Sequence, residues 1–190
     1  MAIEFETQVL DINKDEIANK MRQLGALEVP EVFQRRFVYD INCLNSETPN
    51  MGEWIRLREV HSLLDGVDKI KAELTYKNRQ GIGMDQTTEY EVEVSDFEEA
   101  DKIIRAINFT SSIYYQENKR LKFIFNNVEF CLDTWPQIPC FLEIEGKSEA
   151  AVKDGLALLG LTGKDAGHIG TINIYQRYGI DLHQHKELRF

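Results

Sequence analysis

The chain has 190 residues, of which 43% are hydrophobic, and its formal net charge is -10 at pH 7. This composition is sufficient for one folded domain over residues 1–190, while the charge argues against binding to duplex nucleic acid or an anionic membrane through the overall field of the protein. Acidic residues interrupt the N-terminal segment where a secretory signal would be apolar, and no apolar run approaches the ~20 residues that span a bilayer. The three cysteines do not have metal-ligand spacing. We therefore expect a soluble, cytoplasmic protein.

Alternating polarity predicts a first strand over residues 3–9. The polar face of this strand carries Glu4, Glu6 and Gln8. A capping box at residues 13–16 then predicts an amphipathic helix that ends at Gly25. The region between this helix and residues 38–40 is expected to be rich in loops.

Three further strands are predicted over residues 54–60, 69–77 and 87–94, where the period of hydrophobicity is again two. Their polar faces are basic, mixed and acidic in turn. They carry Arg56 and Arg58, then Lys71, Glu73 and Lys77, then Glu89, Glu91 and Glu93. A second capping box, beginning at Ser95, predicts a helix to Ile107.

The second half of the chain repeats this pattern. Strands are predicted over residues 118–125, 129–133 and 141–145, and their polar faces carry Arg120 and Lys122, Glu129 and Asp133, and Glu143 and Glu145. Ser148 opens a third predicted helix that ends at Gly160, and a short C-terminal helix is predicted near residues 175–178. His168, His183 and His185 lie on no charged strand face and are expected to be solvated.

An antiparallel sheet with one face in water would explain the alternation of any single strand. In this chain, however, the polar positions are mostly ionised and are sorted by strand into basic and acidic faces. About eight strands can close into a barrel wide enough for a small ligand. We therefore predict an α+β fold with a closed eight-stranded antiparallel barrel, a tunnel whose interior is charged and whose apolar outer face is covered by the helices.

Ionised side chains inside such a tunnel need water, metal ions or a charged ligand as partners, because burying an unpaired ion costs several kcal/mol. Clustered carboxylates suit Mg²⁺ or Mn²⁺ better than Zn²⁺. The basic residues would bind a polyphosphate, and they are Arg56, Arg58, Lys71, Lys77, Arg120 and Lys122. A metal together with a basic clamp is what phosphoryl and nucleotidyl transfer require.

Several segments, in order, resemble the motifs of the CYTH superfamily, the triphosphate tunnel metalloenzymes. They are EFETQ, WIRLR, LTYK, EYEVEV, ENKRLKF, CLDTW and FLEIEG. The superfamily includes class IV adenylate cyclases, thiamine triphosphatases and inorganic triphosphatases, and the chain is most similar to bacterial class IV adenylate cyclase-like proteins. The resemblance spans nearly the whole chain and implies an eight-stranded tunnel, a triphosphate substrate and a divalent metal, and a homodimer is compatible with it.

The resemblance also assigns roles to individual positions. It implies that Glu4, Glu6, Glu143 and Glu145 bind the metal with Asp133, and that Arg56, Arg58, Lys77 and Arg120 bind phosphate and act in catalysis with Glu4 and Glu6. Three positions remain open in the comparison. Glu89 and Glu91 can each fill the central acidic positions, Lys119 or Lys122 can accompany Arg120, and Arg35 or Arg36 can contribute from the loop-rich region.

Gln8 stands where the E-x-E-x-K motif has lysine, so the tunnel loses a cation but keeps a hydrogen-bond donor. Loss of a charge-assisted hydrogen bond, about 1.5 to 3 kcal/mol, would slow turnover roughly ten- to a hundredfold. The predicted reaction is conversion of ATP to cyclic AMP and pyrophosphate. Gln8 is still expected to contact the substrate. The alternatives are hydrolysis of tripolyphosphate or thiamine triphosphate, and a catalytically weak module that binds a polyphosphate or nucleotide.

Overall fold

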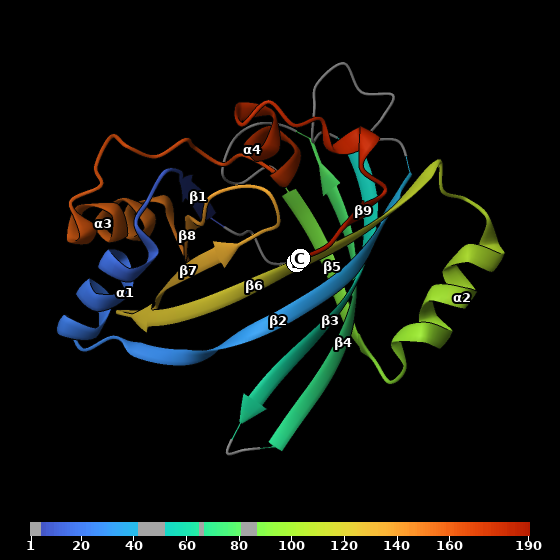
Figure 1. Cartoon of the computed structure of the whole chain (residues 1–190), viewed down its shortest axis with the longest axis horizontal. Helices are drawn as coiled ribbons and strands as arrows, with labels where there is room; N and C mark the ends of the chain where they lie inside the picture. The colour runs from blue at the N-terminus through green and yellow to red at the C-terminus, as the bar shows by residue number, and fades with distance from the viewer. Residues whose placement is uncertain (1–4, 42–51, 65–66, 81–86) are drawn as a thin grey trace.

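A computed structural model of the chain (Figure 1) describes residues 5–41, 52–64, 67–80 and 87–190. In chain order the elements are β1 (Phe5–Val9), α1 (Lys14–Gln23), β2 (Leu27–Asp40), β3 (Gly52–Leu64), β4 (Val67–Arg79), β5 (Thr87–Val94), α2 (Phe97–Ile107), β6 (Ser112–Phe125), β7 (Val128–Thr134), β8 (Phe141–Gly146), α3 (Glu149–Leu159), α4 (Thr171–Arg177), the 3-10 turn η2 (Leu182–Gln184) and β9 (Glu187–Leu188).

The strands form one strongly curved sheet in the order β1-β8-β7-β6-β2-β3-β4-β5, with antiparallel neighbours, and β9 adds a short parallel pairing to β6. The sheet is an open half-barrel, so the prediction of a closed barrel was wrong. In the described part of the chain, β1 and β5 are its two edges. On its free side β1 bonds to a loop instead of to β5: Gln8 N–H donates to Gly167 O (3.2 Å) and Ala166 N–H donates to Gln8 O (2.7 Å).

The strand β2 replaces the loops that we expected before residues 38–40. Its sequence hides the alternation for two reasons. The pairing with β6 shifts register between Val29 and Val32, on either side of Pro30, and a register shift interrupts the period of two. Further along, Arg35 and Arg36 are adjacent arginines that point to opposite faces of the sheet. The fourteen residues of β2 therefore form a long central strand beside β6 and β3.

The predicted helices begin where side chains cap their first turn. The Asn13 side chain accepts hydrogen bonds from the backbone N–H groups of residues 15 and 16, and the Ser148 side chain accepts one from that of Ala151. The second helix is capped by Asp96, one residue after the predicted Ser95. Each cap satisfies backbone donors that have no partner within the helix, which fixes where the chain leaves a strand and turns onto the sheet.

Helices α1, α2 and α3 lie on the outer face of the sheet, as predicted (Figure 1). Helices α1 and α3 pack over β1, β6, β7 and β8 in a cluster that includes Ile17, Met21, Phe123, Phe130, Leu142, Ile144, Val152 and Leu156. Helix α2 packs over β2, β3 and β4 through Phe97 and Ile104. Helix α4 lies over one end of the half-barrel in a third cluster, with Trp135 and Phe141.

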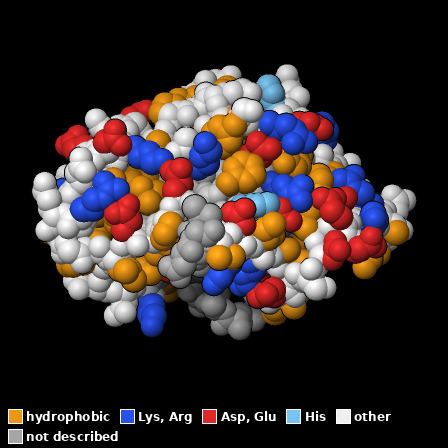
Figure 2. Space-filling model, turned by 60° about the horizontal axis from the view of Figure 1, so that its bottom comes forward, with side chains coloured by type: hydrophobic (Ala, Val, Ile, Leu, Met, Phe, Trp, Pro, Cys, Tyr) orange, Lys and Arg blue, Asp and Glu red, His pale blue; other side chains and the backbone are white. Residues whose placement is uncertain are grey.

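Acidic and basic side chains are interspersed on the face shown in Figure 2, with hydrophobic side chains between them. The excess negative charge of the chain therefore does not gather there into one acidic patch. Among the described helices, none is long and apolar enough to cross a membrane.

Candidate functional site

The concave side of the sheet encloses a cavity of about 570 Å³. Twelve of the fourteen predicted site residues line it: Glu6, Gln8, Arg56, Arg58, Lys77, Glu89, Glu91, Arg120, Lys122, Asp133, Glu143 and Glu145. Glu4 lies outside the described residues. Lys71 is not part of the lining. Its side chain is 53% exposed and pairs with Glu73 (2.9 Å) and Glu93 (3.4 Å).

Glu6, Glu143 and Glu145 form the acidic cluster of the cavity. Strands β1 and β8 pair so that Glu6 faces Glu145 and Gln8 faces Glu143, which puts all four side chains on the inner face. One carboxylate oxygen from each glutamate lies within 4.8 Å of the others. Three converging carboxylate oxygens are a donor set that suits a hard divalent cation, so these residues can hold Mg²⁺ or Mn²⁺.

The remaining predicted acidic ligands lie elsewhere in the cavity and contact cations. Glu89 pairs with Lys77, and Glu91 lies 3.6 Å from Arg56. Asp133 is fully buried and contacts Arg120 at 2.7 Å. These carboxylates therefore balance basic residues, and among the residues that the structure describes the grouping that could hold a metal is the acidic cluster.

Burial and neighbouring charge move the pKa values within the acidic cluster in opposite directions. Burial opposes the ionisation of Glu6, but the contact with His168 and the charges of Lys77 and Arg120 lower its pKa. Burial raises the pKa of Glu143 to about 7, assisted by the charges of Glu6 and Asp133 and opposed by Arg120. Two adjacent carboxylates with opposite shifts are typical of a site that shares protons or binds a cation.

Four arginines from three strands form the basic cluster of the cavity: Arg36, Arg56, Arg58 and Arg120. Arg36 of β2 pairs with Arg58 of β3 in the sheet register. Burial and repulsion from the other arginines lower the pKa of Arg36, and burial followed by the charge of Arg58 lowers that of Arg56 to about 10. The Nε atoms of Arg36, Arg56 and Arg58 are buried and have no hydrogen-bond partner among the described residues. Repelling cations with unused donors favour binding of an anion.

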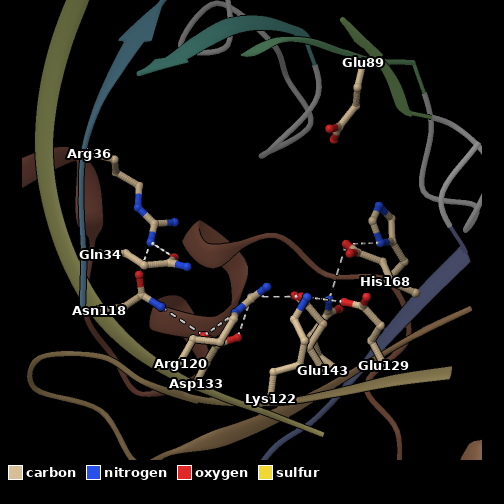
Figure 3. A network of polar contacts seen from close by, with 12 residues as sticks. Gln34, Arg36, Glu89, Asn118, Arg120, Lys122, Glu129, Asp133, Glu143 and His168 are labelled. Atoms are coloured by element: carbon tan, nitrogen blue, oxygen red, sulfur yellow. Dashed lines mark hydrogen bonds and ion pairs between the residues drawn. The ribbon is translucent and has the colours of Figure 1, made fainter. Parts of the chain in front are cut away.

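Arg120 is held in place by a chain of polar contacts (Figure 3). Its Nε and one terminal nitrogen donate to the two carboxylate oxygens of Asp133 (2.9 and 2.7 Å), and the same terminal nitrogen donates to Glu143 (2.9 Å). Asn118 donates to Asp133 at 2.9 Å and accepts from Arg36. Asp133 and Glu143 raise the pKa of Arg120 despite its burial. The network fixes a permanent cation beside the acidic cluster.

The structure resolves two of the alternatives that the sequence left open. Arg36 faces the cavity, whereas Arg35 bonds to Glu59 (2.6 Å) and lies over the ring of Phe97 on the outer face. Lys122 lines the cavity and pairs with Glu129 at 2.5 Å. Lys119 instead lies over the ring of Phe190. Glu89 and Glu91 both line the cavity, so both remain candidates.

Part of the cavity next to α4 is apolar and aromatic. Its lining includes Tyr114, Trp135, Phe141 and Ile174. The guanidinium of Arg36 lies over the Trp135 ring, 4.8 Å from its centroid, and so joins the apolar part to the basic cluster. An aromatic surface beside a phosphate-binding cluster suits a ligand with a flat ring as well as a charged chain.

Sequence reasoning missed His168, which was expected to be solvated. Its side chain is only 8% exposed, lines the cavity, and has Nδ1 2.8 Å from Glu6 Oε1. The residue lies in a segment without strand or helix periodicity between α3 and α4, so no pattern in the sequence could have placed it. His183 also lines the cavity and packs edge-on against Tyr114.

The family model for the CYTH domain matches residues 2–158. The PH1012 protein of Pyrococcus horikoshii is 24% identical, with a TM-score of 0.66 over 86% of this chain and 93% of that chain. A Vibrio parahaemolyticus protein assigned as an adenylate cyclase is 15% identical (TM-score 0.67; 92% and 98% covered). A Hippeastrum protein, assigned as an adenylyl cyclase and described as having a dominant triphosphatase activity, is 12% identical (TM-score 0.61; 94% and 96% covered). The TM-scores show that the three proteins share the fold of this chain. No curated protein matches the chain.

Proposed function

Because this chain belongs to the CYTH domain family, we propose that it is a metal-dependent enzyme that acts on a triphosphate within the cavity. The observation that carries this proposal is that one cavity holds both the acidic cluster and the basic cluster. A cation site alone would not need four arginines, and an anion site alone would not need three converging carboxylates. A triphosphate bound together with a divalent cation satisfies both.

The arginines would bind and orient the phosphate chain. Arg56 and Arg58 alternate along β3, and Arg36 and Arg120 reach the same cavity from β2 and β6. Each guanidinium can make a forked contact with phosphate oxygens. Lys77 would add a point charge from β4. Because Asp133 holds Arg120 rigidly, this contact would cost little reorganisation when substrate binds.

Glu6, Glu143 and Glu145 would hold the metal ion, Mg²⁺ or Mn²⁺. When bound, the ion supplies positive charge next to the reacting phosphate and lowers the cost of bringing a nucleophile to it. The residues of the chain do the positioning: the acidic cluster fixes one end of the site, while the basic cluster holds the phosphates.

The preferred reaction is that of an adenylate cyclase. In it the ribose 3′ hydroxyl of ATP loses its proton as its oxygen bonds to the α-phosphorus, the bond from the α-phosphorus to the bridging oxygen breaks, and pyrophosphate departs and takes up the proton, with its remaining negative charge stabilised by the basic cluster. The aromatic surface at Tyr114, Trp135 and Phe141 supports this assignment because it offers packing for a nucleoside. The cyclase assignment of the similar Vibrio protein points the same way.

Hydrolysis of a triphosphate is the second candidate, with tripolyphosphate or thiamine triphosphate as substrate. The Hippeastrum protein supports it, since a protein of this fold that was assigned as a cyclase is described as having a dominant triphosphatase activity. In that case water would attack the terminal phosphorus, the bond from that phosphorus to its bridging oxygen would break, and orthophosphate would be released while a proton of the water passes to the departing phosphate chain, which the same basic cluster would hold.

The test is to incubate the purified chain with ATP, tripolyphosphate or thiamine triphosphate in Mg²⁺ or Mn²⁺ and to resolve the products. Cyclic AMP with pyrophosphate supports the cyclase, and release of orthophosphate supports the hydrolase. Binding without turnover would reduce the proposal to a binding module. Glu143→Gln should lose activity, whereas Lys71→Ala, outside the cavity lining, should retain it. Absence of both binding and turnover with all three substrates would refute the proposal.

A further inference from the structure

The segment at residues 166–169 completes the wall of the cavity at the free edge of β1. Its backbone bonds to both the N–H and the C=O of Gln8, as an additional short strand would. From the other side, Arg79 of β4 donates to the carbonyl oxygen of His168 at 2.7 Å. The segment is therefore anchored to β1 and to β4, which lies next to the other edge strand, and it bridges part of the gap that leaves the barrel open.

This anchoring carries the imidazole of His168 into the cavity (Figure 3). Both ring nitrogens are buried and neither has a hydrogen-bond partner in the described part of the chain, although Nδ1 lies 2.8 Å from Glu6 Oε1. A buried polar atom without a partner costs about 1 to 3 kcal/mol, and native structures rarely retain one without a reason. A ligand in the cavity would provide the missing partner.

The side chain of Gln8 is arranged to hold this segment. It is 2% exposed, and its Oε1 accepts a hydrogen bond from the backbone N–H of Ile169 at 2.8 Å. Its Nε2 donates to Glu143 (3.3 Å) and Glu6 (3.4 Å). The amide provides an acceptor at one end and a donor at the other, whereas a lysine ammonium can only donate. Gln8 thus ties the residue after His168 to the acidic cluster.

We propose that His168 is a further substrate-contacting residue, whose Nε2 donates a hydrogen bond to the phosphate chain of the triphosphate, and that Gln8 is the positioning residue that holds it there. The inference rests on the proposed function. Nε2 is buried in the wall of the cavity and has no hydrogen-bond partner among the described residues, so a phosphate group bound there would supply that partner. The uncharged Gln8 on β1 is thereby accompanied by a polar contact that comes from another part of the chain.

The experiment measures two affinities by calorimetry, Mn²⁺ alone and tripolyphosphate at saturating Mn²⁺, for the full chain and for His168→Phe. Phenylalanine keeps the ring but removes both nitrogens. We expect tripolyphosphate to bind about 10- to 100-fold more weakly, with the Mn²⁺ affinity changed less than threefold. His185→Phe, which alters a histidine of the same C-terminal region outside the cavity lining, is the matched control and should change neither affinity.

Gln8→Met tests the positioning role, since it keeps the volume and removes the amide. It should weaken tripolyphosphate binding, and the double variant Gln8→Met with His168→Phe should bind no more weakly than His168→Phe alone. Additive losses would overturn the role of Gln8. If His168→Phe does not fold, His168→Gln, with a neutral donor, should show an intermediate loss.

Other outcomes separate this inference from the proposed function. Tripolyphosphate affinity within threefold of the unmodified chain in the histidine variant would overturn the inference alone. An equal loss of Mn²⁺ affinity would also overturn it, because His168 would then support the acidic cluster. If the unmodified chain binds no tripolyphosphate, both the inference and the proposed function fail.

Discussion

Replacing Asp133 with asparagine should destabilise the protein by an amount that reflects a buried ion pair. Asp133 is fully buried, and it accepts two hydrogen bonds from Arg120 (2.9 and 2.7 Å) and one from Asn118 (2.9 Å). Breaking a buried pair costs about 3–5 kcal/mol. Arg120 keeps its contact with Glu143, so the lower end applies, and asparagine preserves the volume of the side chain. We expect a loss of about 3 kcal/mol, or about 6–12 °C in melting temperature for a chain of this length.

Urea unfolding at pH 7 and constant ionic strength measures this loss. Glu129→Gln is the matched control, because Lys122 and Glu129 lie on the same two strands, β6 and β7, but are 32% and 35% exposed. An ion pair that is so exposed contributes about 1 kcal/mol or less. If Asp133→Asn costs no more than Glu129→Gln, then Asp133 does not hold Arg120 in the way that the contacts indicate.

Three further predictions follow from the site and the core. Arg56→Ala should weaken tripolyphosphate binding by tenfold or more without lowering the melting temperature, because burial and Arg58 disfavour its charge in the free protein; a drop in melting temperature would contradict the repulsion. The Glu143 carboxyl should titrate near pH 7 in ¹³C NMR of the metal-free protein, with Glu143→Gln to assign the signal. Because its pKa in the folded protein lies above the ordinary 4.5, ionisation of Glu143 lowers the stability of the fold as the pH rises from about 4.5 through 7. A midpoint below pH 5 would contradict the burial effect. Gly155→Ala should lower the free energy of unfolding by about 1 kcal/mol. A Cβ there would lie 3.0 Å from Ile144 and 3.3 Å from the Phe130 ring, and this crowding outweighs the ~1 kcal/mol that alanine gains over glycine in a helix. A higher melting temperature would show that the side chains of the sheet move aside to accommodate the methyl group.

The sequence predicted the inner faces of most strands because a period of two assigns each side chain to one side of a sheet. It could not predict how far along a strand the cavity extends. Lys71 and Lys77 lie on the same face of β4. Lys71, however, pairs with Val60 in the part of the β3–β4 hairpin that projects beyond the rest of the sheet (Figure 1). Lys77 lines the cavity and Lys71 does not.

The periodicity of the sequence could not predict whether the barrel closes or where His168 lies, and the reason is different. Whether two edge strands meet depends on the accumulated twist and curvature of all the strands between them, and no local pattern records that sum. His168 reaches the cavity because a segment without periodicity bonds to Gln8 across 160 residues of chain, and a contact of that kind has no signature in either segment.

The position of Gln8 shows why one departure from a motif can change its meaning once the fold is known. Read alone, glutamine in place of lysine removes a cation from β1. In the structure its amide is buried between the acidic cluster and the backbone of Ile169. The amide nitrogen donates to the acidic cluster and the amide oxygen accepts from Ile169, whereas lysine could only donate. Lysine at this position would leave the Ile169 N–H without its acceptor and would loosen the segment that carries His168. A lysine cation at position 8 and the hydrogen bond to the Ile169 N–H thus exclude each other, and this chain has the contacts that glutamine makes.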